Sequence, residues 1–297
     1  MSKTLTFDSA PSFGPIYRRV LFGGSSKYQP GSPLPDIAAE WAGAQADAEK
    51  VKAYREAVGL PPGDTLPLLY PHVLTSGLHL SILSDPDFPF SLLGAVHARQ
   101  HCIRHRPILI SERVDAASRV ADSRVVKAGI EFDVTTVLEV GGARVWEAIS
   151  TYLVRGKKFG EPQEPPARAK LDDLPDGDEV GPWQVPANMG RRYAGITGDY
   201  NPIHIADITA KLFGFKQAII HGMWSAARSL AELGKGEEDA PTRADLLFKG
   251  PVFIRYDVKL LAGADGPATR FDLYCGSNPR PVLQGQVGPA GTDTLAG

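Results

Sequence analysis

The sequence predicts an α+β fold in which a long antiparallel sheet wraps around a central helix, with this unit occurring twice. Three observations support the prediction. Each half of the 297-residue chain holds an apolar helical segment followed by several segments with strand-like patterns. The two helical segments are similar to each other. A polar, proline-bearing stretch without apolar periodicity separates the halves.

The separating stretch, GKKFGEPQEPPARAKLDDLPDG, defines the expected domains. We predict an N-terminal half with an N-terminal extension over residues 1–155, a linker over residues 156–178 and a C-terminal half over residues 179–297. The helical segments PHVLTSGLHLSIL and IHGMWSAARSLAEL align His72 with His221. Their alignment also pairs small residues, which would let each helix lie close against a curved sheet.

The N-terminal half is predicted to contain a helix over residues 36–59, DIAAEWAGAQADAEKVKAYREAVG, with Asp36 as its N-cap and Gly59 beyond its end. The apolar helix PHVLTSGLHLSIL follows. After it come the segment LLGAVHARQHCIRHRPI and the strands GIEFDVTTVLEV and ARVWEAISTYLV. The dipeptide Gly141-Gly142 between these strands is typical of a hairpin turn.

The C-terminal half is predicted to begin with a helix near Asn188–Ile196. Another helix starts at Gly222, after which apolar residues recur at the spacing of a buried helix face; they are Met223, Ala226, Ala227 and Leu230. From Pro251 the pattern changes to period two, and the alternation from Val252 to Leu260 predicts a strand with one buried face. TRFDLYCG and PVLQGQV are predicted as shorter strands.

The segment TGDYNPIH lies between the two C-terminal helices. Pro202 disfavours the α region at Asn201, so the chain is expected to turn there. Asn followed by Pro is also a typical helix start. The turn should direct Asp199 and His204 toward a common point, and Gly214 should end the short helix that follows.

A carboxylate and an imidazole at one point can hold and activate a water, because one group takes a proton while the other gives one. The helix start at Gly222 would add free N–H groups and the positive end of the helix dipole, which suit a developing oxyanion. Gly222 also has no side chain to keep a substrate carbonyl away. Asp199 and His204 could instead have purely structural roles, as the aspartate of an Asx-turn and a histidine that caps a helix. The complete motif together with Gly222 favours catalysis.

The motif GDYNPIH, the downstream Ala210 and the helix start IHGM resemble the MaoC-like family, the (R)-specific enoyl-CoA hydratases or hydratase 2 enzymes. LPLLYPHVL and PFSLLGAVHARQ resemble the longer two-domain members of that family, so the resemblance covers most of the chain from about Pro67 onward. It implies a double hotdog fold, with two long antiparallel sheets that each wrap around a central helix.

The resemblance also implies roles for single residues. Asp199 and His204 would be the catalytic pair that activates water, Asn201 would support the loop and the water, and the Gly222 N–H would polarise a thioester carbonyl. The N-terminal half has only GLPPGDTLPLLY before PHVL, without a second motif. One active site per chain is therefore expected, and mutation of His72 should not remove all activity.

The implied reaction is the reversible addition of water to a trans-2-enoyl thioester, which gives an (R)-3-hydroxyacyl thioester. The chain would then be a hydro-lyase of fatty acid metabolism that needs no metal or redox cofactor. Coenzyme A, or the pantetheine arm of an acyl carrier protein, would enter as part of the substrate. Family resemblance also favours a homodimer.

Two other functions fit the same fold class. One is hydrolysis of an acyl thioester, because hotdog folds also host thioesterases. The other is a non-catalytic subunit that binds an acyl chain. The complete motif argues against the first, and the intact pair of Asp199 and His204 argues against the second.

Composition excludes several classes of partner. The net charge of -2 gives no electrostatic footprint for nucleic acid. Cys102 and Cys275 lie far apart without CxxC spacing, which favours a reduced intracellular protein. The sequence shows neither a secretory signal nor an apolar stretch that could span a bilayer. We therefore expect a cytoplasmic protein that does not bind membranes.

Two further clusters of residues are candidates for ligand binding. A histidine-rich strand suggests a metal site at first, but its side chains lack the usual ligand geometry, so no metal is predicted; its members are His97, His101, Cys102 and His105. Four basic residues flank the motif and are candidates for contact with the phosphates of coenzyme A, although solvated helix faces explain them equally well; they are Arg191, Arg192, Lys211 and Lys216. His72 and His221 are expected to set helix starts rather than to act as bases.

Overall fold

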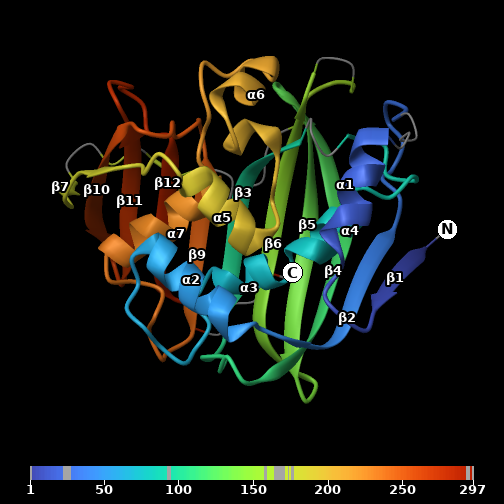
Figure 1. The fold of residues 1–297 in the computed structure, drawn as a ribbon, viewed down its shortest axis with the longest axis horizontal. Coiled ribbons are helices and arrows are strands. Elements are labelled where there is room, and N and C mark those ends of the chain that lie inside the picture. The colour runs from blue at the N-terminus through green and yellow to red at the C-terminus, as the bar shows by residue number, and fades with distance from the viewer. Residues whose placement is uncertain are drawn as a thin grey trace.

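The centre of the molecule is one 12-stranded sheet with the helices lying across one of its faces (Figure 1). This computed structural model describes residues 2–22, 28–91, 95–156, 159–163, 171–172, 174, 177–291 and 295. In spatial order the strands are β1 (Lys3–Phe7), β2 (Ile37–Gln45), β4 (Arg113–Val126), β5 (Gly129–Val140), β6 (Ala143–Arg155), β3 (Ala95–Arg104), β9 (Thr242–Phe248), β12 (Leu283–Pro289), β11 (Ala268–Cys275), β10 (Asp257–Asp265) and β7 (Asp178–Glu179), while β8 (Trp183–Gln184) also pairs with β10.

The two halves of the chain share this sheet. β1 pairs with β2 in parallel, and the other named pairs are antiparallel. The N-terminal strands meet the C-terminal strands where β3 pairs with β9, for example at His101 and Asp245. The described parts of the linker contact both halves, because the Gln163 N–H donates to Val125 of β4 and the Leu174 N–H donates to Asp272 of β11. The proposed boundary between domains stays a prediction.

The helices fill the concave side of the sheet in both halves. They are α1 (Phe13–Phe22), α2 (Ala48–Val58), α3 (Tyr70–Leu74), α4 (Ser76–Leu83), α5 (Met189–Thr197), the 3-10 turn η3 (Pro202–His204), α6 (Asp207–Leu212) and α7 (Gly222–Glu232). Residues 77–83 of α4 are buried throughout. In α7 the four residues predicted to form the apolar face are buried. The buried Trp224 donates its indole N–H to the Ala57 carbonyl at 2.8 Å and so ties α7 to α2.

The helix predicted over residues 36–59 is wrong for its first part and confirmed for its second. Its first part is strand β2, in which Ile37, Ala39 and Trp41 are buried at alternate positions. This period of two identifies a strand, but the many alanines around it also suit a helix and conceal the period. The helix begins after Asp47, whose side chain accepts from two N–H groups of the first turn, and it ends as predicted at Gly59 in the left-handed region (φ 80°).

Two other elements differ from the prediction. The strand expected from Val252 begins only at Asp257; the preceding residues are buried alternately because they pair with the segment that enters α7, through Ile220 N–H to Val252 and Ile254 N–H to Ala218. The central helix of the N-terminal half is divided into α3 and α4 at Thr75. The Thr75 hydroxyl donates to the carbonyl four residues earlier, a contact that bends helices.

The remaining strand predictions are confirmed, since β3, β5, β6, β11 and β12 lie where the patterns indicated and a two-glycine turn joins β5 to β6. β1, β4, β7, β8 and β9 were not predicted.

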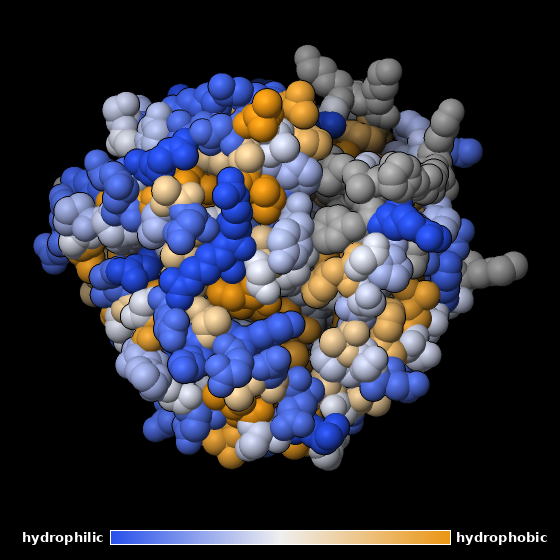
Figure 2. Space-filling model, in the orientation of Figure 1, coloured by the Kyte–Doolittle hydropathy of each residue, from blue (hydrophilic) through white to orange (hydrophobic). Residues whose placement is uncertain are grey.

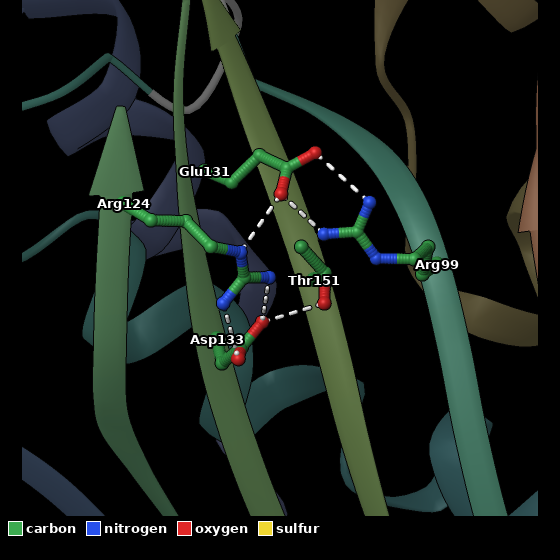
Figure 3. A network of polar contacts seen from close by, with 5 residues as sticks. All are labelled: Arg99, Arg124, Glu131, Asp133 and Thr151. Atoms are coloured by element: carbon green, nitrogen blue, oxygen red, sulfur yellow. Dashed lines mark hydrogen bonds and ion pairs between the residues drawn. The ribbon is translucent and has the colours of Figure 1, made fainter. Parts of the chain in front are cut away.

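A network of charged side chains crosses the other face of the sheet, away from the helices (Figure 3). Arg124 of β4 binds Asp133 of β5 through two hydrogen bonds of 2.9 and 3.0 Å and also donates to Glu131. Arg99 of β3 reaches Glu131 from the other side, and the Thr151 hydroxyl of β6 donates to Asp133. Each carboxylate therefore has charged partners, which is the condition for burying it.

The helix α6 forms an apolar projection on the described surface. Figure 2 shows hydrophobic side chains at the top of the molecule, over α6. Ile208 and Leu212 of this helix are 74% and 80% exposed, and Phe213 follows them at 40%. None of the helices among the described residues is long and apolar enough to cross a membrane.

Candidate active site

The predicted turn around Asn201 and Pro202 forms, and it holds the Asp199 carboxylate in place. α5 ends at Gly198, which has a left-handed φ of 76°. The Asn201 side chain accepts from the Ile203 N–H and caps η3, while the Asn201 N–H donates to the Asp199 carboxylate at 3.1 Å. A 3-10 turn and the separate helix α6 replace the single short helix that was predicted, and Gly214 follows α6 with φ 83°.

Asp199 and His204 converge on one side of the turn. Their Oδ2 and Nε2 atoms lie 4.0 Å apart. The His204 Nδ1 lies 2.9 Å from the Ile219 carbonyl, which can only accept, so Nδ1 carries a proton. In the neutral ring Nε2 therefore presents its lone pair toward the carboxylate. The gap is too long for a direct hydrogen bond but lets a single water donate to both atoms.

A second histidine, His221, lies against this pair. Its ring stacks on His204 with centroids 3.7 Å apart. Its Nε2 donates to the Asp199 carbonyl at 2.9 Å and lies 3.7 Å from the Asp199 Oδ2. His221 occupies the N-cap position of α7 as expected, but its side chain makes no capping hydrogen bond and instead positions Asp199. This role was not predicted; the motif IHGM was the only signal for it.

Burial and charge fix the protonation states of the pair. Burial lowers the pKa of His204 to about 3, and the neighbouring His221 acts in the same direction against the charge of Asp199. Burial alone would raise the pKa of Asp199, but the two histidines and the Asn201 N–H outweigh it, so this pKa is lowered. At neutral pH the site therefore holds a carboxylate beside a neutral imidazole.

The start of α7 faces the same space. Gly222 is the first residue of the helix, where N–H groups have no acceptor within the helix. A Cβ on Gly222 would lie 2.9 Å from the Phe248 ring, so glycine is required here by packing as well as by access to the N–H. Gly190 of α5 is equally confined, because its Cβ would lie 2.1 Å from the His204 carbonyl oxygen.

These groups line a cavity of about 350 Å³ between the two halves. Asp199, Asn201, His204, His221 and Gly222 come from the C-terminal half. The N-terminal half contributes residues of α3, α4, β3 and β6. The structure thus brings together the four site residues that were predicted, and their catalytic roles stay predictions.

The four basic candidates lie elsewhere on the surface. Arg191 donates to the Ile205 carbonyl, Arg192 pairs with Glu56, and Lys216 lies over the Phe253 and Tyr256 rings. None of the four belongs to the described wall of the cavity. Their contact with phosphate stays a prediction.

The donor atoms of Asp199, His204 and His221 lie within 4.8 Å of one another and could in principle hold a metal ion. The hydrogen bond of His221 opposes this, because its Nε2 donates to the Asp199 carbonyl, whereas His204 donates through Nδ1 and keeps the lone pair of Nε2. Among the described residues, the histidines of β3 form no such group. The prediction that the protein uses no metal is not tested by these distances.

Comparison with known proteins matches the architecture and the site region. The MaoC like domain matches residues 160–273, a range that contains the whole turn and the start of α7. The curated 3-hydroxyacyl-thioester dehydratase X of Mycobacterium tuberculosis is 37% identical over 210 residues, which cover 70% of this chain and 73% of that protein.

Solved structures agree. The crystal structure of HtdX of Mycobacterium tuberculosis has a TM-score of 0.71 at 30% identity and covers 84% of this chain and 98% of that chain. A conserved Mycobacterium tuberculosis protein described as a double hotdog has a TM-score of 0.54 at 12% identity, over 89% and 96% of the two chains, which is a likeness of fold alone. The predicted double hotdog fold is thereby confirmed, with its two sheets joined through β3 and β9, and the chain belongs to the MaoC-like family.

Proposed function

We propose that the protein is a hydro-lyase that reversibly adds water to trans-2-enoyl thioesters and removes it from (R)-3-hydroxyacyl thioesters. The observation that carries the proposal is the pair of Asp199 Oδ2 and His204 Nε2, which lie 4.0 Å apart on a cavity that also receives the start of α7. The similarity to a 3-hydroxyacyl-thioester dehydratase supports the same reaction.

The chemistry follows from the two protonation states. A water that donates to both Asp199 and His204 keeps its oxygen lone pairs free to attack C3 of the enoyl group. The carboxylate accepts a proton as the C3–O bond forms, and the electron pair of the double bond moves toward the thioester oxygen. The Gly222 N–H stabilises this developing charge at the positive end of α7. The Asp199 carboxyl group then gives this proton to C2, which completes the addition of water and regenerates the carboxylate.

The thioester carrier and the location belong to the same proposal. Either coenzyme A or an acyl carrier protein would deliver the acyl chain through its pantetheine arm, and the reaction would serve fatty acid metabolism in the cytoplasm. No metal or redox cofactor takes part in the steps above. Both cysteines are buried and free, in keeping with a reduced compartment.

The test is turnover by variants of the pair. Asp199→Asn and His204→Asn should each lower kcat for hydration by about 10²- to 10⁴-fold, the usual contribution of a general acid–base group. Loss of absorbance at the enoyl thioester band measures the reaction. Matched controls are Asp257→Asn and His105→Asn, both of which lie outside the cavity wall.

Three outcomes would contradict the proposal. Near-normal turnover by Asp199→Asn would remove the proposed base. Release of free thiol from an acyl thioester, without loss of the enoyl band, would identify a thioesterase instead. A wild-type chain that binds acyl thioesters and turns over none of them would favour the non-catalytic subunit.

A further inference from the structure

The cavity continues past the reacting groups to a polar wall in the N-terminal half. Four side chains form it, and we call them the histidine wall: His72 of α3, His79 of α4, His97 of β3 and Tyr152 of β6. Their rings contact one another, with His97 stacked on both His72 and Tyr152 at centroid distances of 5.3 and 5.1 Å. The steps proposed for hydration use none of them.

The wall begins close to the reacting groups. Phe248 links the two regions, because its ring lies against Gly222 on one side and its centroid lies 5.0 Å from that of His97 on the other. The cavity is also lined by Leu80 and Leu83 of α4. An acyl chain bound with its carbonyl at Gly222 and extended toward the N-terminal half would therefore meet both the histidine wall and an apolar lining.

Part of the wall is fixed by its own hydrogen bonds. The two nitrogens of the His79 ring lie 2.9 Å from the Tyr152 hydroxyl and 2.7 Å from the Thr136 hydroxyl, and Thr136 bonds in turn to Ser118. His79 is 2% exposed. His79 and Tyr152 are thus held rigidly, with no ring nitrogen of His79 left for a ligand.

His72 and His97 differ from His79. The buried Nδ1 of His72 and Nε2 of His97 have no hydrogen-bond partner within the described residues. Both rings are only partly buried and line the cavity, and a half-turn about Cβ–Cγ would exchange the positions of nitrogen and carbon. Polar groups kept out of water without a partner are unfavourable, and a ligand oxygen that bonded to them would remove this penalty.

The wall suits a neutral oxygen rather than a charged one. Burial lowers the pKa of His72 to about 4 and that of His97 to about 3, and it lowers the pKa of His79 as well. At neutral pH the three rings are uncharged, and a neutral imidazole has one donor and one acceptor; both nitrogens of His79 are already bonded, whereas His72 and His97 each keep one nitrogen for a ligand. A hydroxyl or a carbonyl can bond to such rings, whereas a carboxylate would find no opposite charge among them.

We propose that the histidine wall selects substrates whose acyl chain carries a hydroxyl or carbonyl oxygen beyond C3, together with an apolar tail that contacts Leu80 and Leu83 of α4. This inference rests on the proposed hydration of enoyl thioesters and specifies the class of acyl group. A site built to bond a substrate oxygen discriminates strongly against the analogue that lacks it, because its own polar groups are then left without partners.

The experiment compares two trans-2-enoyl-CoA substrates of equal chain length, one unsubstituted and one with a hydroxyl on C5. Wild-type protein should prefer the hydroxylated substrate in kcat/KM. His97→Phe keeps a ring between Tyr152 and Phe248 but removes the nitrogens, and His72→Phe does the same in α3. Each should reduce the preference by about 10- to 100-fold, the range expected for one or two lost hydrogen bonds. His105→Phe, outside the cavity wall, is the matched control.

Crotonyl-CoA separates this inference from the proposed function, because its acyl chain ends at C4 and carries no oxygen beyond C3. Hydration of crotonyl-CoA by the wild type and by both variants, together with the lost preference, is the expected result. Preference of the wild type for the unsubstituted chain would overturn the inference and leave the proposed function intact, even if the variants failed to fold. An equal loss in the variants for both long substrates would also overturn it. Failure to hydrate any substrate would overturn both.

Discussion

The protonation state of His204 is set by its burial and by two neighbours, the Ile219 carbonyl and the His221 ring. One ring nitrogen donates to the Ile219 carbonyl, and the stacked His221 discourages a positive charge on the ring. Burial lowers the pKa of His204 to about 3, and the pKa of Asp199 is lowered as well. Both groups thus keep their working forms, carboxylate and neutral imidazole, until the pH falls through these lowered values.

The pH dependence of kcat/KM tests this arrangement. Because both pKa values are lowered, activity should be level from neutral pH down through about 6.5, the ordinary pKa of histidine, and should fall only in more acidic solution. The measurement is kcat/KM for crotonyl-CoA across this range, with circular dichroism to establish that the protein stays folded. An acid limb centred near 6.5, or a rate that rises on acidification, would mean that His204 works as an imidazolium.

The sequence predicts the catalytic pair of Asp199 and His204, but it does not predict that His221 holds this pair in position. Asp199 and His204 could be predicted because a short motif carries both of them and the turn between them. His221 lies outside that motif, and its stacking on His204 depends on how α7 enters beside the turn. No local spacing indicates such a contact.

The elements around the site depend on close backbone packing. α5 lies against the turn so tightly that a Cβ on Gly190 would meet the His204 carbonyl oxygen at 2.1 Å. Gly195, on the same helix, has room, since its Cβ would meet only the Tyr200 hydroxyl at 3.8 Å. The position of His204 therefore depends on the absence of a side chain at one point of α5.

This pair of glycines makes a matched test. Gly190→Ala should displace the turn, lower kcat markedly and reduce the free energy of unfolding by about 1–3 kcal/mol, as other overpacked sites do. Gly195→Ala should leave kcat nearly unchanged and stabilise the helix by up to about 1 kcal/mol, because alanine favours a helix over glycine. Steady-state kinetics and urea unfolding measure both effects. Equal behaviour of the two variants would show that the contact at Gly190 is unimportant.

The packing of whole helices and strands also explains which parts of the fold could be predicted and which could not. Long periodic segments such as β5, β6 and α7 were predicted because one face of each is buried and the pattern records it. β2 was mistaken for helix because small alanines suit either structure, and the alternate burial of Ile37 and Trp41 appears only once β4 lies beside them. The late start of β10 could not be predicted, because Val252 and Ile254 owe their burial to residues 218–220.

At the scale of the whole molecule, the sheet is continuous because two chain halves pair through β3 and β9. Pairing of two hotdog sheets therefore needs no second copy of the chain. The homodimer favoured by family resemblance stays a prediction, and it would have to use another surface. Light scattering of the purified protein would measure the mass directly, and a monomer at all concentrations would contradict the prediction.

The junction itself contains a buried polar contact. His101 of β3 and Asp245 of β9 are direct partners in the register, and Nδ1 of the fully buried histidine donates to the carboxylate at 2.7 Å. Arg243 donates to the same carboxylate at 2.8 Å. Burial alone would raise the pKa of Asp245, but these two partners outweigh it and the pKa is lowered. Their contribution to stability is therefore present above the ordinary aspartate pKa and is lost as the pH falls through the lowered value.

Removal of the carboxylate should loosen the two halves from each other. Asp245→Ala leaves the His101 ring buried without its partner, so we expect the free energy of unfolding at neutral pH to fall by about 3 kcal/mol. Asp265→Ala, which removes an exposed carboxylate that accepts a hydrogen bond from Gln286, should change it by less than about 0.5 kcal/mol. Urea unfolding measures both. The difference between the variants should shrink as the pH is lowered below about 4, where this aspartate becomes protonated in the unfolded chain, and should vanish once the pH falls through its lowered pKa in the folded protein. Equal stabilities at neutral pH would mean that the backbone pairing of β3 with β9 and the packing around it hold the halves together without this contact.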